Sequence, residues 1–408
     1  MRWWPGRRKA DPQALVSISD PAAAALLTMG ARNYSGVEVN ELGLLGLSGM
    51  YRAMSLLSGT MGMLPLKTFQ DVPGGDRKPE KSVFDNPGGP DGPTPFEWMR
   101  DLVLYHKIHG NVFSWKLRNA AGAVVGFEHI HPLLVTTERP TAHELRDGPL
   151  PRGGYWMKFR RTVGDSTDEI RTDLDDVMHI RGLSVDGMRG LSLVQLASNS
   201  LGTAVAGDRA AARIFSQGAM MGGIVSPKED VEGFNAVDIR NELMSSATGY
   251  ENAGSLAVIN RVLDFTPWTM TMQDAQFLQG RQFSIEEISR WTGVPPHLLM
   301  QTEKQTSWGT GVEQQNTGMS RSVLGPDANL YEQRFSREIG PKARFVEFDF
   351  AGLERPAPEK EIELLIAQWA ADLLTLNEVR KIRNMPRIEG GDVVKSVWEA
   401  SHVQPAAS

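Results

Sequence analysis

Apolar residues recur at intervals of three to five along residues 43–66, which is the spacing of one buried helix face. Pro65 is the expected end of this helix, because proline lacks the backbone N–H that would continue its hydrogen-bond pattern. Residues 66–70 are then predicted to form a strand. Residues 72–93 are dense in Pro, Gly and Asp, so they are expected to form a loop.

A second helix is predicted to begin after Thr94. Pro95 suits the first helical position, and Glu97 stands three residues beyond Thr94, where its carboxylate can complete a capping box. Gly110 is the expected end of the helix, since glycine commonly terminates helices.

The region that follows changes from helical spacing to short alternating runs. Between residues 111 and 180, runs of alternating apolar and polar residues are separated by turn residues, which predicts an antiparallel sheet. Residues 191–217 are predicted to form a long helix whose frequent Ala and Gly residues would let neighbouring helices approach closely. The first half of the chain is therefore predicted to be α+β.

The centre of the chain combines short strands with helices. Residues 222–272 are predicted to form a small α/β module. Residues 273–291 are predicted to form a helix, which the Gly-Val-Pro-Pro sequence at 293–296 ends. Residues 298–311 are then expected to form a polar loop.

A second long helix is predicted at residues 312–339. It should be kinked at Gly325 and Pro326, because proline removes a donor and clashes with the preceding turn. Residues 1–40 have no sustained period and are expected to form a partly ordered arm. The remaining predicted elements are a strand at 344–350 and helices at 359–374 and 377–384.

Composition limits the classes of protein that fit this pattern. A chain of 408 residues with 41% hydrophobic content can bury a sizeable core, and it has no cysteine for disulfides or thiolate metal sites. We expect a soluble protein, because neither an export signal nor an apolar run of about 20 residues is present. The net charge of −6 disfavours tight DNA binding, which needs a basic surface, but it permits a conduit along which DNA slides.

Two histidines are candidate metal ligands. His129 and His131 lie two residues apart in a predicted strand and so point to the same face. A zinc site is conceivable there, but the chain has no cysteine ligands and no helical HExxH pairing. Structural histidines are the favoured interpretation.

Two groups of carboxylates could hold metal ions for phosphoryl transfer, namely Asp173, Asp175 and Asp176, and the pair Glu286 and Glu287. Solvated surface charge is the commoner explanation of such groups. Neither a GxxxxGK[ST] loop nor a GxGxxG loop is present to bind nucleotide phosphates. The favoured interpretation has no catalytic residue, metal or cofactor. The rival is a metal-dependent hydrolase or nuclease that uses these histidines and carboxylates.

Five segments in order resemble portal proteins of the HK97 type from tailed phages. The matching features are the first wing helix, the helix that leads into a GN turn, an H-[IF]-[RK]-G…DG…G-x-S motif, IEEI…GVPPHLL, and a closing NE-x-R…P…GGD. In this chain they lie at residues 51–66, 96–112, 177–193, 273–299 and 377–392. The departures are Val112, where the family often has alanine, and the loop sequence TEKQTSWGTG.

The resemblance implies a portal fold with a fixed order of parts. These are an N-terminal arm (1–42), a β-rich wing (43–190), a first stem helix (191–221), a small α/β clip (222–272), a second stem helix (273–298), a tunnel loop (299–311), a kinked tunnel helix (312–340), a wing return strand (341–356), and a C-terminal helical crown and tail (357–408).

The resemblance also implies a function. The chain would form a dodecameric ring at one capsid vertex of the virion after assembly in the host cytoplasm, and double-stranded DNA would be packaged and ejected through it without sequence specificity. Implied partners are the terminase large subunit, the head-tail adaptor and the major capsid protein, with no membrane involved. Gene transfer agents have close relatives of these portals, so the sequence does not separate phage, prophage and gene transfer agent.

The polar loop is the part that the resemblance places against DNA. Glu303 and Lys304 cancel in formal charge, which leaves mainly neutral polar groups for weak contacts with phosphates. The residues expected to face DNA are Gln301, Thr302, Lys304, Gln305, Thr306, Ser307 and Trp308.

Overall fold

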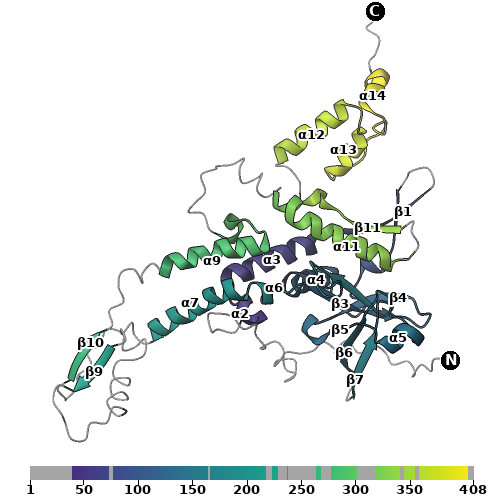
Figure 1. The fold of residues 1–408 in the computed structure, drawn as a ribbon. Helices are drawn as coiled ribbons and strands as arrows, with labels where there is room; N and C mark the ends of the chain where they lie inside the picture. Colours follow the sequence, from purple (N-terminus) through teal and green to yellow (C-terminus); the bar gives the residue numbers. More distant parts are fainter. Residues whose placement is uncertain are drawn as a thin grey trace, which may run out of the picture. The chain divides into compact units, whose positions relative to one another are not determined.

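The fold was analysed in a computed structural model, which describes residues 39–72, 77–163, 166–216, 223–227, 237, 263–267, 277–300, 318–340, 344–353 and 358–402. The chain divides into two compact units, residues 1–348 and 349–408 (Figure 1). Helices and strands are mixed in the first unit, whereas the described part of the second unit is helical. The predicted α+β class is confirmed.

The helices of the first unit, in chain order, are α2 (Glu41–Leu45), α3 (Ser48–Met63), η1 (Val83–Asp85), α4 (Pro95–His109), η2 (Pro132–Leu134), α5 (Ala142–Asp147), α6 (Leu193–Leu196), α7 (Ser198–Ser216), α9 (Phe277–Thr292), η5 (Pro296–Leu299), the π-helical turn η6 (Ser320–Leu324) and α11 (Gly325–Glu338).

The capping box predicted for α4 is confirmed, because Thr94 caps the helix and its backbone N–H donates to Glu97 Oε2 at 2.9 Å. Gly110 ends α4 in the left-handed conformation, with φ of 67°.

The strands that the structure describes in the first unit form four small antiparallel sheets. Their bounds are β1 (Leu66–Asp71), β2 (Arg77–Glu80), β3 (Asn111–Arg118), β4 (Val124–Ile130), β5 (Thr136–Glu138), β6 (Trp156–Val163), β7 (Ser166–Thr172), β8 (Val177–Arg181), β9 (Gly223–Pro227), β10 (Leu263–Pro267) and β11 (Arg344–Phe348). The strand orders are β11-β1-β2, β4-β3-β8, β5-β6-β7 and β10-β9. Residues 111–180 were expected to form one sheet, and instead they contribute strands to two sheets.

An aromatic cluster joins α4 and α11 to the strands. Phe84, Trp98, Phe127 and Phe335 are each no more than 2% exposed, and the Phe84 and Phe335 ring centroids lie 4.5 Å apart. Burial of four aromatic side chains is a large hydrophobic contribution, so this cluster holds α11 against elements that precede it by more than 200 residues.

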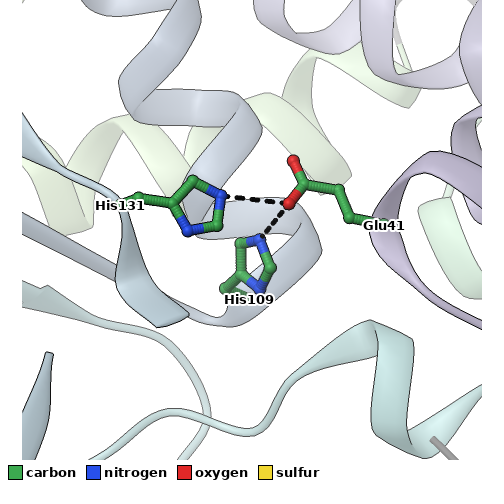
Figure 2. A group of neighbouring side chains, drawn as sticks. All are labelled: Glu41, His109 and His131. Carbon is green, nitrogen blue, oxygen red and sulfur yellow. Dashed lines mark hydrogen bonds and ion pairs between the residues drawn. The ribbon is translucent and has the colours of Figure 1, made fainter. Parts of the chain in front are cut away.

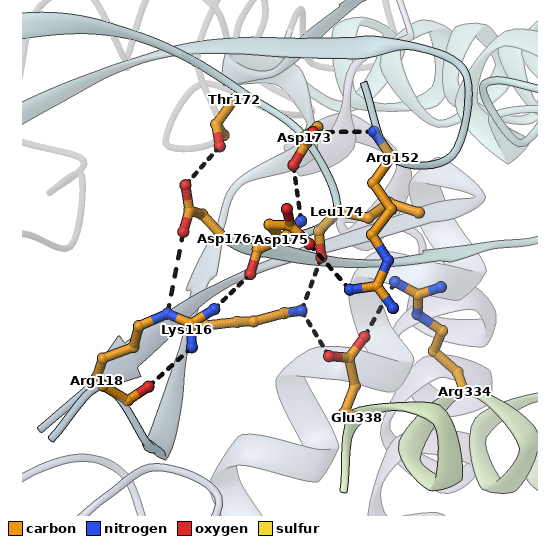
Figure 3. A network of polar contacts seen from close by, with 11 residues as sticks. Lys116, Arg118, Arg152, Thr172, Asp173, Leu174, Asp175, Asp176, Arg334 and Glu338 are labelled. Atoms are coloured by element: carbon orange, nitrogen blue, oxygen red, sulfur yellow. Dashed lines mark hydrogen bonds and ion pairs between the residues drawn. The ribbon is translucent and has the colours of Figure 1, made fainter. Parts of the chain in front are cut away.

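Polar contacts fix the two ends of α11, and Figure 3 shows those at its C-terminal end. Near its beginning, Lys107 of α4 pairs with Asp327 at 2.5 Å. Near its end, Lys116 Nζ of β3 lies 2.6 Å from Glu338 Oε2, and Arg334 pairs with the other carboxylate oxygen at 3.1 Å. Lys116 and Glu338 are only 6% and 9% exposed, so their charges satisfy one another away from water.

Two helices extend from this body side by side (Figure 1). Helix α9 packs against α7 and also against α3, and Trp291 Nε1 donates to Ser200 Oγ at 2.9 Å. In the sequence, the paired strands β9 and β10 lie between these helices. The predicted continuous helix at 191–217 is instead two helices, α6 and α7, interrupted at Ala197.

Two further predicted helices differ in detail. The single helix expected over 43–66 is divided into α2 and α3, because Asn40 caps a short first helix and Leu47 takes an extended conformation before the second. The kink expected at Gly325 and Pro326 coincides with a change in hydrogen bonding, since the π-helical turn η6 immediately precedes α11. Proline has no N–H for the regular α pattern, which is the physical reason for irregularity at this place.

The second unit contains α12 (Pro358–Ala370), α13 (Leu376–Ile382) and α14 (Lys395–His402), preceded by the short helix η7 (Phe350–Gly352). Thr375 and Glu378 form a capping box at α13. Asn377 accepts from the Ile388 N–H at 2.9 Å and donates to Asp392 at 3.0 Å, so it ties α13 to the Gly-Gly-Asp turn. The helices predicted at 359–374 and 377–384 correspond to α12 and α13.

Replacing Lys116 with methionine should lower the free energy of unfolding by about 3 kcal/mol, because it leaves the buried Glu338 carboxylate with one cation instead of two. Chemical denaturation of the purified variant and wild type would measure this difference.

Arg146→Met is the matched control. Arg146 and Asp147 pair at 3.6 Å but are 75% and 64% exposed, so the expected loss is about 0–1 kcal/mol. Equal losses in the two variants would contradict the role assigned to the buried pair.

Candidate functional site

Asn111 lies at the centre of a hydrogen-bonded junction between segments far apart in the sequence. It is 1% exposed, and its side-chain amide donates to the carbonyls of His109 at 2.8 Å and Gly190 at 2.9 Å. Its Oδ1 accepts from the Gly190 N–H at 2.8 Å and from His179 Nε2 at 3.1 Å. All four hydrogen-bonding positions of this amide are therefore used.

Three glycines allow the backbones at this junction to approach closely. The Gly182 N–H donates to the Gly110 carbonyl at 2.9 Å. A Cβ added at Gly190 would lie 1.9 Å from the same carbonyl oxygen, and one added at Gly110 would lie 2.1 Å from the carbonyl of Leu191. Side chains at Gly110 or Gly190 would force these backbone segments apart.

His179 continues the junction into the core. Its Nε2 carries the proton given to Asn111, and its Nδ1 accepts from the Tyr155 hydroxyl at 2.6 Å. Burial lowers the pKa of His179 well below its ordinary value, so the ring is neutral at pH 7. This neutral tautomer satisfies both nitrogens.

The junction also sets where α6 begins. Ser192 Oγ donates to the Ile108 carbonyl at 3.2 Å, and the Leu191 N–H donates to the Leu183 carbonyl at 2.7 Å. The GN turn and the H-x-R-G…DG…G motif, which look separate in the sequence, are thus one structural unit that directs the chain from β8 into α6 and α7.

A second polar cluster joins Glu41 of α2 to two histidines (Figure 2). His109 Nε2 and His131 Nε2 each lie 3.0 Å from Glu41 Oε2. Burial by itself raises the pKa of Glu41. The hydrogen bonds from His109 and His131 together outweigh this effect and lower the pKa to about 2. The carboxylate is therefore charged across the physiological pH range.

The hydrogen bonds of His131 argue against a metal in this cluster. Its Nδ1 accepts from the Leu133 N–H at 3.3 Å, so the proton of the neutral ring sits on Nε2 and is donated to Glu41. A metal would need the Nε2 lone pair that this proton occupies. We therefore interpret the cluster as a charged hydrogen-bond clamp.

His129 and His131 do not share a site, which agrees with the favoured interpretation that they are structural histidines. His129 Nε2 donates to the Trp98 carbonyl at 2.9 Å, and its Nδ1 lies 2.8 Å from Ser114 Oγ. Burial lowers the pKa of His129 to about 4, which keeps it neutral. The two rings both contact Tyr105, but they share no ligand position.

The acidic group before β8 is used structurally (Figure 3). Asp173 accepts from the backbone N–H groups of Arg152 at 2.9 Å and Asp175 at 2.8 Å. Asp175 pairs with Arg152 at 2.9 Å, and Asp176 accepts from Thr172 at 2.9 Å. Carboxylates engaged in this way form a turn and leave no preformed two-metal site.

Glu286 and Glu287, the second candidate pair of carboxylates, both lie on α9. The Glu286 carboxylate lies 3.8 Å from the Arg290 guanidinium, and Glu287 is hydrogen-bonded to the same guanidinium. Both carboxylates therefore form ion pairs with Arg290 on the exposed side of the helix.

The polar loop after α9 lies outside the described residues from position 301 onward, so the seven residues expected to face DNA are not placed. What is described is the approach to this loop: α9 ends at Thr292, Gly293 has φ of 73°, and η5 leads to Met300 in the left-handed conformation. The break predicted at 293–296 is confirmed.

Among the residues that the structure describes, none of the helices is both long enough and apolar enough to cross a membrane.

Replacing Gly190 with alanine should lower the free energy of unfolding by about 3 kcal/mol, because the new methyl group would overlap the Gly110 carbonyl. Thermal or chemical denaturation would measure the loss. Gly59→Ala in α3 is the control, since nothing lies within 4 Å of the added Cβ, and it should be neutral or stabilise by up to about 1 kcal/mol.

Replacing Glu41 with glutamine should lower the free energy of unfolding by about 3 kcal/mol at pH 7. The folded pKa is about 2 and the ordinary value is 4.5, so the stabilisation is fully present above pH 4.5 and is lost as the pH falls toward 2. The difference in free energy of unfolding between wild type and Glu41→Gln, measured by denaturation from pH 7 to pH 3, should become smaller below pH 4.5.

The clamp interpretation has a second consequence, that Zn²⁺ should leave the melting temperature unchanged. If Zn²⁺ raised the melting temperature of the wild type but not of Glu41→Gln, the cluster would be a metal site and the clamp interpretation would be wrong.

Comparisons with known proteins agree with the arrangement described above. The sequence model of the family "Phage portal protein" matches residues 48–384. The chain is 29% identical over 387 residues to the probable portal protein of Streptomyces phage phiC31, covering 91% of this chain and 82% of that protein. It is 27% identical over 377 residues to the portal protein of Enterobacteria phage HK97, covering 90% and 85%.

Solved structures share the fold. The HK97 family phage portal protein from Corynebacterium diphtheriae matches with a TM-score of 0.55 and 16% identity, covering 79% of this chain and all of that chain. A chain in the neck of an empty gene transfer agent particle matches with a TM-score of 0.54 and 20% identity, covering 85% and 92%. The family match spans most of the sequence, and this chain therefore belongs to the phage portal protein family.

Proposed function

We propose that this chain is one subunit of a ring at a single capsid vertex, through which double-stranded DNA is packaged and ejected. The observation that carries the proposal is the family match over residues 48–384. The net charge of −6 agrees with it, since DNA must slide past the protein without being held. Portal proteins are structural, so the enzymatic alternative is set aside, and the engaged histidines and carboxylates agree with this.

The proposed division into parts keeps the boundaries expected from the sequence. The stem helices would be residues 191–221 and 273–298, with a clip at 222–272. Support comes from the packing of α7 against α9 and from the antiparallel pair β9 and β10, which stands between them in the sequence. Support for a wing return strand at 341–356 comes from β11, which pairs with β1.

The ring is proposed to be a dodecamer in the virion. A chain of similar fold belongs to the neck of a native gene transfer agent particle computed with C12 symmetry, which supports this number. The proposed partners are the terminase large subunit during packaging, the head-tail adaptor afterwards, and the major capsid protein around the vertex. Both phage and gene transfer agent portals are among the matches, so either kind of particle fits.

The narrowest part of the channel is proposed to be the tunnel loop at 299–311, which contains the seven residues expected to face DNA. The described residues on either side of positions 301–317 support the placement. On one side, η5 ends the approach from α9, and on the other, the π-helical turn η6 leads into α11, whose ends are held by Lys107 and Lys116. Residues before 318 would therefore attach to a firmly held helix.

Replacing Lys304 and Gln305 together with alanine should change the length or the retention of packaged DNA without preventing ring assembly, because these side chains are proposed to touch phosphates weakly. Electrophoresis of DNA from purified particles would measure length, and nuclease sensitivity would measure retention.

Lys67→Ala is the control, since Lys67 lies on β1 in the proposed wing and should leave both quantities unchanged. Wild-type length and retention in assembled Lys304→Ala/Gln305→Ala particles would contradict the placement of the tunnel loop.

A further inference from the structure

The loop between β8 and α6 is held rigidly by its own hydrogen bonds. Asp186 Oδ1 accepts from the backbone N–H groups of Met188 at 2.7 Å and Arg189 at 2.9 Å, and from Ser184 Oγ at 3.0 Å. The Gly187 N–H donates to Ser184 Oγ at 3.1 Å. These bonds are all made within residues 184–189.

The base of this loop is fixed as firmly. Gly182 and Gly190 both belong to the junction with Gly110 and Asn111. In addition, Arg189 donates to the carbonyls of Val135 at 2.7 Å and Pro132 at 3.1 Å. The loop is therefore a preorganised structure.

Two apolar side chains project from this rigid loop. Leu183 is 81% exposed and Val185 is 84% exposed, the two highest values among the large hydrophobic residues that the structure describes. We call Leu183 and Val185 the apolar tip. A rigid tip loses little conformational entropy when it binds, which makes it suited to recognition. An apolar tip fits a protein surface and offers nothing to phosphates.

An apolar patch lies at the opposite end of α4. Met63 is 67% exposed and Phe96 is 40% exposed, and Gly62 lies directly on the Phe96 ring, since a Cβ added there would be 3.0 Å from it. We call Met63 and Phe96 the apolar patch. Gly110, on which the apolar tip is built, ends α4, whereas Phe96 lies in its first turn. The helix has 15 residues, so tip and patch are separated by about 20 Å.

The charges around the tip and the patch have opposite signs. Beside the tip, Arg139 donates to the Asp186 carbonyl at 3.3 Å, and Arg181 and Arg189 flank the loop, so three cations oppose the single anion Asp186. This group carries a net charge of +2 from those four residues.

At the patch, the Arg100 guanidinium lies over the Phe96 ring, 5.9 Å from its centroid, and 3.9 Å from Asp101, while Glu97 lies in the first turn of the helix. That group has a net charge of −1 from the three residues. Complementary potentials favour the approach of one surface to the other.

We propose that in the ring the apolar tip of each copy packs on the apolar patch of the next copy. The inference rests on the proposed function, because it assigns a contact of the ring. Identical chains close into a ring when two different surfaces of each copy meet head to tail, and surfaces at opposite ends of one helix meet that requirement. Two side chains do not make a whole interface, which buries about 800 Å² per partner, so the tip acts as a hot spot within a larger contact.

The first test compares ring assembly by sedimentation velocity and negative-stain electron microscopy over a range of protein concentrations. Leu183→Ser/Val185→Ser and Met63→Arg should each raise the concentration at which half of the chains are in rings by at least about tenfold. Met63 is exposed at the end of α3, so arginine there should leave the monomer folded.

Leu145→Ser/Leu150→Ser is the matched control, since these residues are also exposed, at 63% and 61%, but lie outside the tip and the patch. It should assemble like wild type, and unchanged circular dichroism would establish that every variant is folded.

The second test mixes the two variants. A chain without the tip keeps its patch, and a chain without the patch keeps its tip. At concentrations where each variant alone is monomeric, an equimolar mixture should therefore form a one-to-one dimer that cannot grow.

The outcomes separate the contact from the proposed function. If wild type and both variants form rings equally well, or if the mixture gives no dimer, the proposed contact is wrong but the proposed ring is not contradicted. A wild-type protein that never forms rings would overturn both the contact and the proposed function.

Discussion

The side chain of Asn111 and the backbone of Gly190 form the interaction on which most of the described structure depends. Their two hydrogen bonds join residues 79 positions apart, and the Gly110 carbonyl can accept the Gly182 N–H only because Gly190 has no side chain. Through this junction the end of α4, the end of β8 and the beginning of α6 are held in one arrangement. Helix α7 follows α6 after the interruption at Ala197.

Helix α11 is held to the same body by a different kind of contact. Phe335 is buried among aromatic rings, and the pairs Lys107–Asp327 and Lys116–Glu338 fix the two ends of the helix. A portal protein makes the ring at a capsid vertex through which DNA is packaged and ejected. A helix anchored at both ends suits the segment that follows the tunnel loop in the proposed arrangement.

Local signals in the sequence predicted the elements that depend on them. Thr94 and Glu97 predicted the beginning of α4, and Gly110 predicted its end, because capping involves residues within four positions of one another. The same signal, at Thr141 and Glu144, could have predicted α5 within the region expected to be all sheet. The break at Ala197 and the division of 43–66 into two helices have no comparably strong local signal, since apolar spacing continues across both.

By itself the sequence determined the family, through five motifs in order, and with it the α+β class and the expectation of a ring. Only the tertiary structure decided which polar residues meet. His129 and His131 are neighbours in sequence yet bind different partners, whereas His131 meets Glu41, 90 positions away. Sequence spacing describes geometry over a few residues, but a buried charge or amide is satisfied by whatever group the packed core brings to it.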